Sequence, residues 1–535
     1  MTFGFNRSHQ AYGPNRVQLK EFSNSAAQHS NAAPFKVAIV YNQSAHAVKM
    51  VVDELRSEWG NTIKIIQVIG DNQAVSNVDA SIKIDSGKWN DLDHFEDRLN
   101  QFKLQNPSYR VEIESKKTAF TAVWSGFAEA GSTGRKVEAM GLIWTGTTPD
   151  ISDGLEKMGF KEFCDQVGAP TPEWFKLPNA ENIDDSLRLI SEKCTSGSWM
   201  IKSIFGGGGV GTKSFSDVKN ISDVKSALKR VIGETKSAEG IYLEKKVDVK
   251  GGFYQGEFEV DGNQVAHGTR IVWFNANNAK VLEIGCQDEY IDQLGMPIEL
   301  IQKIKDDSKK IAEISKNNTR GTIEALIYKT DLGEWAYTFI EMNRRPQVEN
   351  EALAYLEMNP KTGLRRKTFV ESFKRACGVP ATPKVPSNVK FIAHGRILVG
   401  DPNSDGVITN HLGTIKGMSG PLPADVEAES ICEGEISATS NPQHGRVLIS
   451  GQSFQDVCEK LATYFKFRKP VVDGVDSTYG EGLSSIIGSE SFKKGNIASN
   501  ETFTKRDLPT RETSASTIER ALKIVTDVMV DGYRG

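Results

Sequence analysis

The sequence has little net charge, few cysteines and no long apolar run. Its 535 residues include 65 basic and 69 acidic side chains, a net charge of −4, and no basic segment is long enough to bind a nucleic-acid backbone. No stretch approaches the about 18 apolar residues that cross a bilayer. The 6 cysteines show no CxxC spacing, which predicts buried thiols rather than disulfides or a zinc site. Nucleic acid and membrane are therefore excluded as partners.

Glycine is the one residue type in clear excess. The chain has 48 glycines against roughly 37 expected for its length, and five of them lie between residues 206 and 211. The first 35 residues are polar and have no apolar segment of the kind a secretory signal needs. We interpret them as an N-terminal extension and expect a cytoplasmic protein, or one of an organellar matrix if this extension is a transit peptide.

Hydrophobic periodicity predicts a mixed α/β chain of several domains. The run Lys36–Tyr41 is typical of a buried parallel strand, and Ser44–Trp59 has helical spacing. Further strands are expected at Ile63–Ile69, Ala122–Trp124 and Gly141–Trp144, and a helix at Asp91–Phe102.

A second region extends from Thr148 to Gly378, and its elements are expected in the order helix, glycine-rich hairpin, helix, strands, helix and strand pair before a final helix. The three helices with defined bounds are Ile151–Val167, Ser222–Ile232 and one near Ile298–Lys316. A proline-rich linker, Val379–Lys390, precedes a mixed α/β region from Phe391 to Thr504, and Thr517–Met529 is predicted to be helical.

The glycine cluster lies between two predicted strands, Ser198–Ile204 and Val210–Phe215. Glycines let backbone N–H groups approach a polyphosphate, and Lys202 on the first strand can add a positive charge. The spacing nearly matches a Walker A loop, but no helix follows it. A hairpin flap over a nucleotide therefore fits better than a Walker loop, with a flexible linker as the alternative.

A second constellation lies in Trp335–Glu349 (WAYTFIEMNRRPQVE). Alternate residues of an extended chain share a face, so Glu341, Asn343 and Arg345 are expected to point together. Glu324 lies on a strand that a turn at Asp331–Gly333 can pair with this one. Two facing carboxylates are unfavourable without a cation, which indicates a magnesium site; ion pairs on an exposed sheet face are the alternative.

These residues resemble the biotin carboxylase branch of the ATP-grasp superfamily. The most specific element is EMNxRxQVE, intact at Glu341–Glu349, and supporting segments include MGFK from Met158 and GRILVGDP from Gly395. The resemblance extends from about Lys36 to Thr504. It implies an α/β (α+β) fold made of a Rossmann-like preATP-grasp domain, an ATP-grasp domain with a glycine-rich flap, and a biotin-carboxylase-type C-terminal domain.

The implied boundaries follow these units along the chain. They are an N-terminal extension (1–35), the Rossmann-like domain (36–148), the ATP-grasp domain (149–378, with the flap subdomain at about 168–240), the C-terminal domain (388–505) and a C-terminal helical extension (506–535).

The resemblance also implies a role for individual residues. The ATP contacts would be phosphate-binding lysines, flap glycines, two residues at the adenine hinge and two asparagines: Lys161, Lys202, Gly206, Gly207, Gly208, Gly209, Gly211, Glu244, Lys245, Asn275 and Asn278. Magnesium, or manganese, would be bound by Glu324, Glu341 and Asn343. Bicarbonate would be held by Lys280, Arg345, Gln347 and the backbone of Val348, with Glu349 as general base and Arg396 stabilising the biotin enolate.

The implied reaction suits these residue types. Bicarbonate attacks the γ-phosphate of ATP, which requires cations for two anions and a positioned carboxylate base. The biotin enolate needs a donor that keeps its proton, and arginine is such a donor. The resemblance implies a biotin carboxyl carrier protein and a carboxyltransferase as separate chains, and a homodimer or larger complex.

Three departures from the family pattern stand out. Asn275 and Asn278 replace longer side chains before Lys280, which predicts weaker or altered ATP binding. The family's YDxxxxK signature appears as SNPQHGR, ending at Arg446, and its HPV motif after Glu349 as Asn350–Ala352. The acid-base and bicarbonate residues are intact, which favours an active enzyme.

There are two alternatives to this interpretation. One is an ATP- and bicarbonate-dependent ligase with a non-biotin acceptor such as an amide or urea nitrogen. The other is a catalytically impaired homologue with a structural role in a carboxylase complex.

Overall fold

The computed structural model describes residues 33–496 with short gaps at 43, 71–73, 86, 90, 115–120, 126–130, 179, 195, 205–210, 248, 250–251, 275–279, 319, 380–381, 400, 403–407, 410–412, 437–442 and 478. The side chains of 121–125, 401–402, 408–409 and 475 also lie outside the description. The predicted flap residues Gly206 to Gly209, the asparagines 275 and 278 and the helix Thr517–Met529 fall outside the described residues, so those predictions stay predictions.

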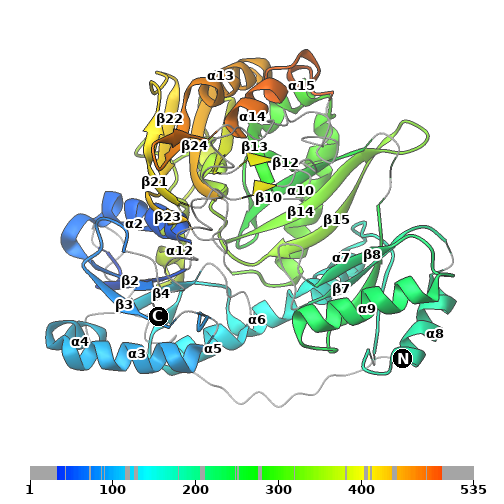
Figure 1. Ribbon diagram of the computed structural model, residues 1–535, viewed down its shortest axis with the longest axis horizontal. Coiled ribbons are helices and arrows are strands. Elements are labelled where there is room, and N and C mark those ends of the chain that lie inside the picture. Colours follow the sequence, from blue (N-terminus) through cyan, green and yellow to red (C-terminus); the bar gives the residue numbers. More distant parts are fainter. Residues whose placement is uncertain are drawn as a thin grey trace, which may run out of the picture.

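The chain begins with a five-stranded parallel sheet in the order β3-β2-β1-β4-β5 (Figure 1). Its strands are β1 (Val37–Tyr41), β2 (Lys64–Ile69), β3 (Ala80–Lys83), β4 (Thr121–Ser125) and β5 (Ile143–Trp144). β1 is central and all five of its residues are buried, as expected for a parallel strand covered on both faces. The strands predicted in this region are confirmed, whereas β3 was not predicted because its four residues show no apolar run.

Helices cover this sheet on both sides. They are α2 (Ala45–Trp59), the 3-10 turn η1 (Gly60–Thr62), α3 (Leu92–Gln105), α4 (Pro107–Glu114) and α5 (Gly131–Ala139). The two predicted helices begin where side-chain caps allow it, because Ser44 and Asp91 accept hydrogen bonds from the backbone N–H of Ala47 and His94.

The single helix predicted over Ile151–Val167 is wrong. The structure has two helices, α6 (Pro149–Gly154) and α7 (Lys157–Val167). Glu156 between them is extended, with φ −60° and ψ 166°. The chain turns so tightly here that a Cβ at Gly159 would lie 2.1 Å from the carbonyl oxygen of Gly154, so glycine is required there.

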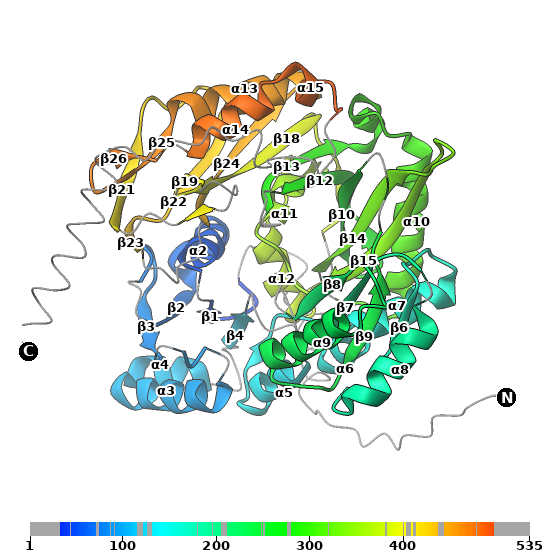
Figure 2. The same ribbon diagram turned by 45° about the vertical axis from the view of Figure 1, so that its right-hand side comes forward.

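A small four-stranded sheet, in the order β6-β9-β7-β8, follows. Its strands are β6 (Trp174–Lys176), β7 (Trp199–Ser203), β8 (Thr212–Phe215) and β9 (Ile241–Lys245), and it shares a core with α8 (Ile183–Lys193) and α9 (Ile221–Thr235). β7 and β8 pair antiparallel, so the predicted hairpin is confirmed. Figure 2 shows this unit at the side of the molecule away from the first sheet.

The largest element is a nine-stranded sheet in the order β15-β14-β10-β12-β13-β18-β24-β22, with β11 beside β10. Its strands are β10 (Phe253–Asp261), β11 (Gln264–Val265), β12 (Gly268–Phe274), β13 (Lys280–Gln287), β14 (Arg320–Lys329), β15 (Trp335–Asn343), β18 (Phe391–Leu398), β22 (Val426–Ile431) and β24 (Gln443–Gly451). Because β13 pairs with β18, the sheet is continuous across the linker predicted at Val379–Lys390.

That linker is also more ordered than its prolines predict. Within it β17 (Val385–Pro386) pairs with β16 (Glu357–Met358), and the side-chain amide of Gln287 donates to the carbonyls of Ser387 and Val389 at 3.0 and 3.1 Å. The segment is therefore fixed to the large sheet.

One face of the large sheet is apolar and carries the main core. It is covered by η2 (Asp288–Leu294), α10 (Ile298–Ile314), α13 (Phe454–Phe467), α14 (Tyr479–Ile487) and α15 (Glu490–Lys493), of which the last three are the orange helices of Figure 2. The short α11 (Asn350–Tyr355) packs on the other face, and α12 (Thr368–Ala376) packs on α2. The remaining short strands are β19 (Asp401–Pro402), β20 (Ile408–Thr409), β21 (Gly413–Ser419), β23 (Gly434–Ile436), β25 (Lys469–Val472) and β26 (Val475–Asp476).

The six cysteines are all free thiols, and five of them are buried, which confirms the prediction from their spacing. Among the described helices, none is long and apolar enough to cross a membrane.

Candidate active site

The second face of the large sheet is polar, and the strand alternation explains why. On β10 the residues Gln255, Glu257, Glu259 and Asp261 alternate with residues of the apolar core such as Phe258. The register places Glu257 opposite Arg270 of β12 on one side and opposite Glu324 of β14 on the other. Directly opposed residues share a face, so charged side chains from neighbouring strands meet here, buried under the rest of the molecule.

The predicted phosphate-binding lysines converge on one carboxylate. The Nζ atoms of Lys161 (α7) and Lys202 (β7) each lie 2.5 Å from a carboxylate oxygen of Glu244 (β9), and Lys161 and Glu244 are almost fully buried. Burial alone raises the pKa of Glu244, but the two lysines outweigh it and lower that pKa. Two cations held by a single carboxylate leave a net positive charge at this point, which suits a phosphate.

Two further predicted ATP residues lie at the ends of strands in the small sheet, Lys245 as the last residue of β9 and Gly211 just before β8. Lys245 is partly exposed and its Nζ lies 3.3 Å from a carboxylate oxygen of Glu173. The backbone N–H of Gly211, the one flap glycine within the described residues, donates to Glu234 at 2.9 Å. Gly211 has φ +71°, a conformation that glycine adopts without strain.

The predicted metal ligands are brought together by the strand pair β14 and β15. Glu324 lies directly opposite Glu341 in the register, and the side-chain amide of Asn343 donates to Glu324 at 2.7 Å. Gln255 donates to the other oxygen of Glu324 at 2.8 Å. The predicted turn and the facing carboxylates are thus confirmed as geometry.

This group has the chemistry of a hard-cation site, two carboxylates and an amide oxygen. Burial and the neighbouring Glu257 and Glu341 raise the pKa of Glu324, in spite of Lys280. Clusters of three or more His, Cys, Asp or Glu side chains suited to a metal are absent from the described residues. Other ligands of a cation here would therefore have to come from a bound nucleotide or from water.

One part of the predicted alternation is wrong. β15 ends at Asn343, so Arg345 lies in the following loop and does not continue the strand face of Glu341. The proline at position 346 accounts for this, because it cannot donate a ladder hydrogen bond and restricts the residue before it.

The residues predicted to handle bicarbonate meet at the centre of the polar face. Lys280 forms ion pairs with Glu257 and, at 3.4 Å, with Glu324. Gln347 accepts a hydrogen bond from Arg270 at 2.9 Å. Glu349 pairs with Arg396. Val348, which lies between Gln347 and Glu349 in the chain, packs partly against the core of the first domain.

Glu349 is held in its ionised form. Burial opposes ionisation, but Arg396, Lys280 and Arg270 together lower the pKa of Glu349 well below its ordinary value. The neighbouring carboxylates Glu257, Glu283 and Glu349 raise the pKa of Lys280 and of Arg396. All three groups therefore carry full charge at neutral pH.

Sequence reasoning missed three charged residues that complete this cluster. Arg270 is fully buried, donates to Glu257, and lies with its Nε 3.2 Å from Glu283. Arg396 donates to Glu283 at 3.0 Å. We call the following seven residues the site network: Glu257, Arg270, Lys280, Glu283, Glu324, Glu349 and Arg396. The signal for Glu257 was present as period-two acids in QGEFEVD, which a strand buried on both faces does not normally contain.

The sequence departures lie next to Arg396. Arg446 of β24 stands opposite Arg396 of β18 in the register and is paired through two nitrogens with Glu351. Two of the three departures from the family pattern, the segment that ends at Arg446 and the segment Asn350–Ala352, thus supply the two partners of one ion pair. Its bidentate geometry offsets the repulsion between Arg396 and Arg446.

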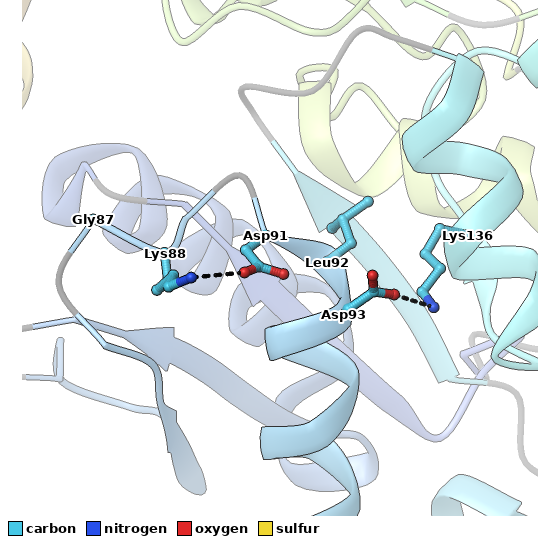
Figure 3. A pocket seen from close by; sticks show the side chains of 6 residues that line it. All are labelled: Gly87, Lys88, Asp91, Leu92, Asp93 and Lys136. Carbon is cyan, nitrogen blue, oxygen red and sulfur yellow. Dashed lines mark hydrogen bonds and ion pairs between the residues drawn. The ribbon is translucent and has the colours of Figure 1, made fainter.

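Three hollows in the described part of the chain are lined by other residues. One of about 540 Å³ lies on the first domain, where Figure 3 shows Lys88 paired with Asp91 and Lys136 with Asp93. Its charged side chains satisfy one another near the surface, so it resembles ordinary solvated surface.

Comparison with known proteins defines first the class of the central domain. Residues 156–357 match the family model described as "Carbamoyl-phosphate synthase L chain, ATP binding domain". This segment of the chain is therefore similar to an ATP-binding domain, and it includes Lys161, Lys202, Lys280 and the motif at Glu341–Glu349.

The complete fold is that of a biotin carboxylase. A biotin carboxylase from Campylobacter jejuni superposes with a TM-score of 0.70 over 88% of this chain and 99% of that one, at 16% identity. The biotin carboxylase domain of a 2-oxoglutarate carboxylase from Hydrogenobacter thermophilus, in a complex with MgADP and bicarbonate, gives 0.69 over 87% and 97%, at 19% identity.

Sequence similarity to a curated protein is weaker. A pyruvate carboxylase from Aspergillus terreus is 26% identical over 231 residues, which are 42% of this chain and 18% of that protein. The chain thus matches less than a fifth of the length of this relative, and the relative's other regions have no counterpart in the match.

Proposed function

We propose that the protein is the biotin carboxylase component of a multisubunit carboxylase. In this proposal it uses MgATP to convert bicarbonate to carboxyphosphate and carboxylates N1 of biotin on a separate carrier protein, which then feeds a carboxyltransferase. The single observation that carries the proposal is the site network. This cluster combines the carboxylate Glu349 with the cations Arg270, Lys280 and Arg396 and with Glu324, which faces the partly exposed Glu341 on the next strand.

The ATP phosphates would lie between the two lysines and the facing carboxylates. Lys161 and Lys202 both pair with the single carboxylate of Glu244. The positive charge that Glu244 does not neutralise would attract a phosphate. Glu324, Glu341 and Asn343 fit Mg²⁺ by the chemistry of their oxygens. A bound Mg²⁺ would neutralise phosphate oxygens during transfer.

Bicarbonate would lie near Gln347, whose amide is held by Arg270. Lys280 and Arg345 supply positive charge for the two anions, and Glu349 is ionised and so can take the bicarbonate proton. An oxygen of bicarbonate attacks the γ-phosphorus and ADP leaves. Carboxyphosphate then collapses to CO2 and phosphate, and phosphate takes the N1 proton of biotin.

Arg396 would stabilise the biotin enolate. It is nearly buried, and its pairs with Glu283 and Glu349 hold the guanidinium in place. A guanidinium does not lose its proton under these conditions, so it can donate to a developing oxyanion without becoming the acid itself.

The proposal is tested by bicarbonate-dependent ATP hydrolysis with and without free biotin or a biotinylated carrier. We expect hydrolysis that biotin stimulates, and loss of the stimulation in Arg396→Met. The matched control is Arg188→Met, since that side chain is 72% exposed and remote from the network.

The other outcomes separate the alternatives. Bicarbonate-dependent hydrolysis that biotin and the carrier leave unchanged indicates a different carboxyl acceptor. A folded protein without bicarbonate-dependent hydrolysis contradicts the proposal and indicates a structural homologue.

A further inference from the structure

Two buried histidines beside the site network have no role in the chemistry above. His394 lies on β18 and His46 in the first turn of α2, with 0% and 3% of their surfaces exposed. None of their four ring nitrogens has a hydrogen-bond partner among the residues that the structure describes. Buried polar atoms without partners cost about 1–3 kcal/mol each and are rare in native proteins. Two unsatisfied imidazoles near the same charged groups therefore indicate a place where a ligand supplies the missing partners.

The register places His394 on the polar face. It lies opposite Glu283 of β13 and two residues before Arg396 on the same strand, so its side chain and that of Arg396 share one face. The charged groups that act on His394 are Glu349, Arg396, Arg446 and Arg270.

His46 reaches the same point from the first domain. The groups that act on it are Arg446, Glu349, Arg396 and His444, which are largely those around His394. Figures 1 and 2 both show α2 next to β23 (Gly434–Ile436), so the first domain lies beside a strand from the last third of the chain. The two imidazoles thus border the Arg396–Glu349 pair from opposite domains.

Both imidazoles are neutral. Burial first, and then the nearby arginines, lower the pKa of His46 to about 3 and that of His394 well below its ordinary value. A neutral imidazole has one N–H donor and one lone-pair acceptor. The Nε of Arg396 is a further buried donor without a partner among the described residues. The region between His394, His46 and Arg396 therefore offers hydrogen-bond donors and at least one acceptor. These groups are complementary to a neutral ligand that carries an N–H next to a C=O.

We infer that His394 and His46 line the site of the carboxyl acceptor, and that His394 accepts a hydrogen bond from the acceptor N–H while Arg396 binds the adjacent carbonyl. This inference rests on the proposed function and assigns its acceptor specificity to a ureide or amide. An acceptor without an N–H leaves the His394 lone pair unsatisfied.

The experiment compares His394→Leu with His394→Gln, which keeps an amide oxygen as acceptor. Steady-state ATP hydrolysis with bicarbonate is measured against the concentration of free biotin, and in parallel with urea and a biotinylated carrier. We expect His394→Leu to raise the KM for biotin about tenfold, the effect of one lost hydrogen bond, with a smaller change in kcat, and His394→Gln to restore most of the loss. His46→Leu should give a smaller rise in KM. The control is the exposed His267→Leu.

Thermal unfolding separates binding from a structural role. If the imidazole waits for a ligand, His394→Leu removes unsatisfied polar atoms and unfolds at an equal or higher temperature than the unaltered protein. A lower unfolding temperature with equal loss in the Leu and Gln variants would overturn the inference. So would a KM for biotin within twofold of normal in His394→Leu, or an unaltered protein that hydrolyses ATP with bicarbonate but responds to none of the three acceptors. Absence of bicarbonate-dependent hydrolysis in the unaltered protein refutes the proposed function instead.

Discussion

Two buried ion networks lie on the same face of β10, one on either side of Phe258. The site network begins at Glu257. A second group, which we call the anchor network, begins at Glu259 and joins β10 and β14 to the segments around α12: Glu259, Asp261, Arg320, Glu357, Arg366, Arg375 and Lys384. The two networks share a strand and are both built from buried arginine, lysine and carboxylate side chains. They differ in the ratio of cations to carboxylates.

In the anchor network cations outnumber carboxylates, four to three, and each carboxylate is closely paired. Arg366 donates to both oxygens of Glu259 at 2.7 Å, and Asp261 has three cationic neighbours within 3.3 Å. Every group is thus tied to another group of the chain, and truncation of one leaves a buried charge behind.

In the site network the four carboxylates Glu257, Glu283, Glu324 and Glu349 face three cations. Burial and the surplus of carboxylates raise the pKa of Glu283 and of Glu324, and unsatisfied histidines border the cluster. The difference is therefore one of charge balance: cations match or exceed the carboxylates in the anchor network, whereas the site network has one carboxylate more than its cations. Mutations in the two should therefore separate stability from activity.

The largest effect is expected from Glu349→Gln. Loss of the proposed general base should lower bicarbonate-dependent ATP hydrolysis by ~10²–10⁴-fold. The unfolding temperature should fall only modestly, because the glutamine oxygen can still accept from Arg396 although the charge that Arg396, Lys280 and Arg270 stabilise is lost. Rates and thermal unfolding are measured on one preparation, with the exposed Glu313→Gln as control. A variant that is strongly destabilised but keeps its rate of hydrolysis would contradict the proposed difference between the site network and the anchor network.

Arg366→Met should give the reverse pattern. It leaves Glu259 and Glu357 buried without their main partner, so the free energy of unfolding in urea should fall by ~3–5 kcal/mol. The rate per folded molecule at low temperature should change little. Arg365→Met, next to it and stacked on the ring of Tyr355, should cost less than ~1 kcal/mol; equal losses would refute a special role for the bidentate pair.

The pH dependence of stability should reveal the cation surplus of the anchor network. Burial first, and then Arg320 and Arg366, lower the pKa of Lys384 from 10.5 to about 8. Between pH 8 and 10.5 the unfolded chain binds a proton that the folded chain has released, so stability rises with pH in that window. Relative to Lys384→Met the gain should approach ~3 kcal/mol.

Unfolding of both proteins in urea is followed from pH 7 to 10.5. A difference that stays constant across this range would contradict the depressed pKa. A decrease with rising pH would show that Lys384 is stabilised as a cation, like the arginines around it.

The smallest effect concerns the junction of the anchor network with the first domain. Glu54 of α2 accepts hydrogen bonds from the backbone N–H groups of Thr368, Phe369 and Val370 at the start of α12. Glu54→Ala should therefore cost ~1–2 kcal/mol, the value of a helix cap. Asp53→Ala, which loses only the surface pair with Lys49, is the control, and an equal loss there would contradict the capping role.

Local patterns predicted the elements well where one period dominates. The β-branched run of β1, the capped helices α2 and α3 and the hairpin of β7 and β8 were all predicted from a few residues. Prediction failed where a contact that the hydrophobic period does not reveal decides the structure. The break between α6 and α7 depends on the close approach of Gly159 to Gly154, and the linker near Val385 is ordered by a strand far away in the sequence.

The candidate site shows the same division. The motif at Glu341–Glu349 and the lysines 161, 202 and 280 were predicted, because their residue types are unusual in a strand or helix interior and match a known pattern. Glu257, Arg270, Glu283 and His394 were not, because each lies in an otherwise ordinary strand. Their importance comes from neighbours on other strands.

The sequence by itself determined most of the order of the strands and helices, and the charged and glycine-rich segments on which the proposed ATP and bicarbonate chemistry rests. Only the tertiary structure decided which charges are already neutralised. The reason is physical: the free energy of a buried charge depends on partners a few ångströms away, and those partners are set by strand register rather than by sequence distance. Glu257 and Glu259 are two residues apart, but one faces the site and the other secures the fold.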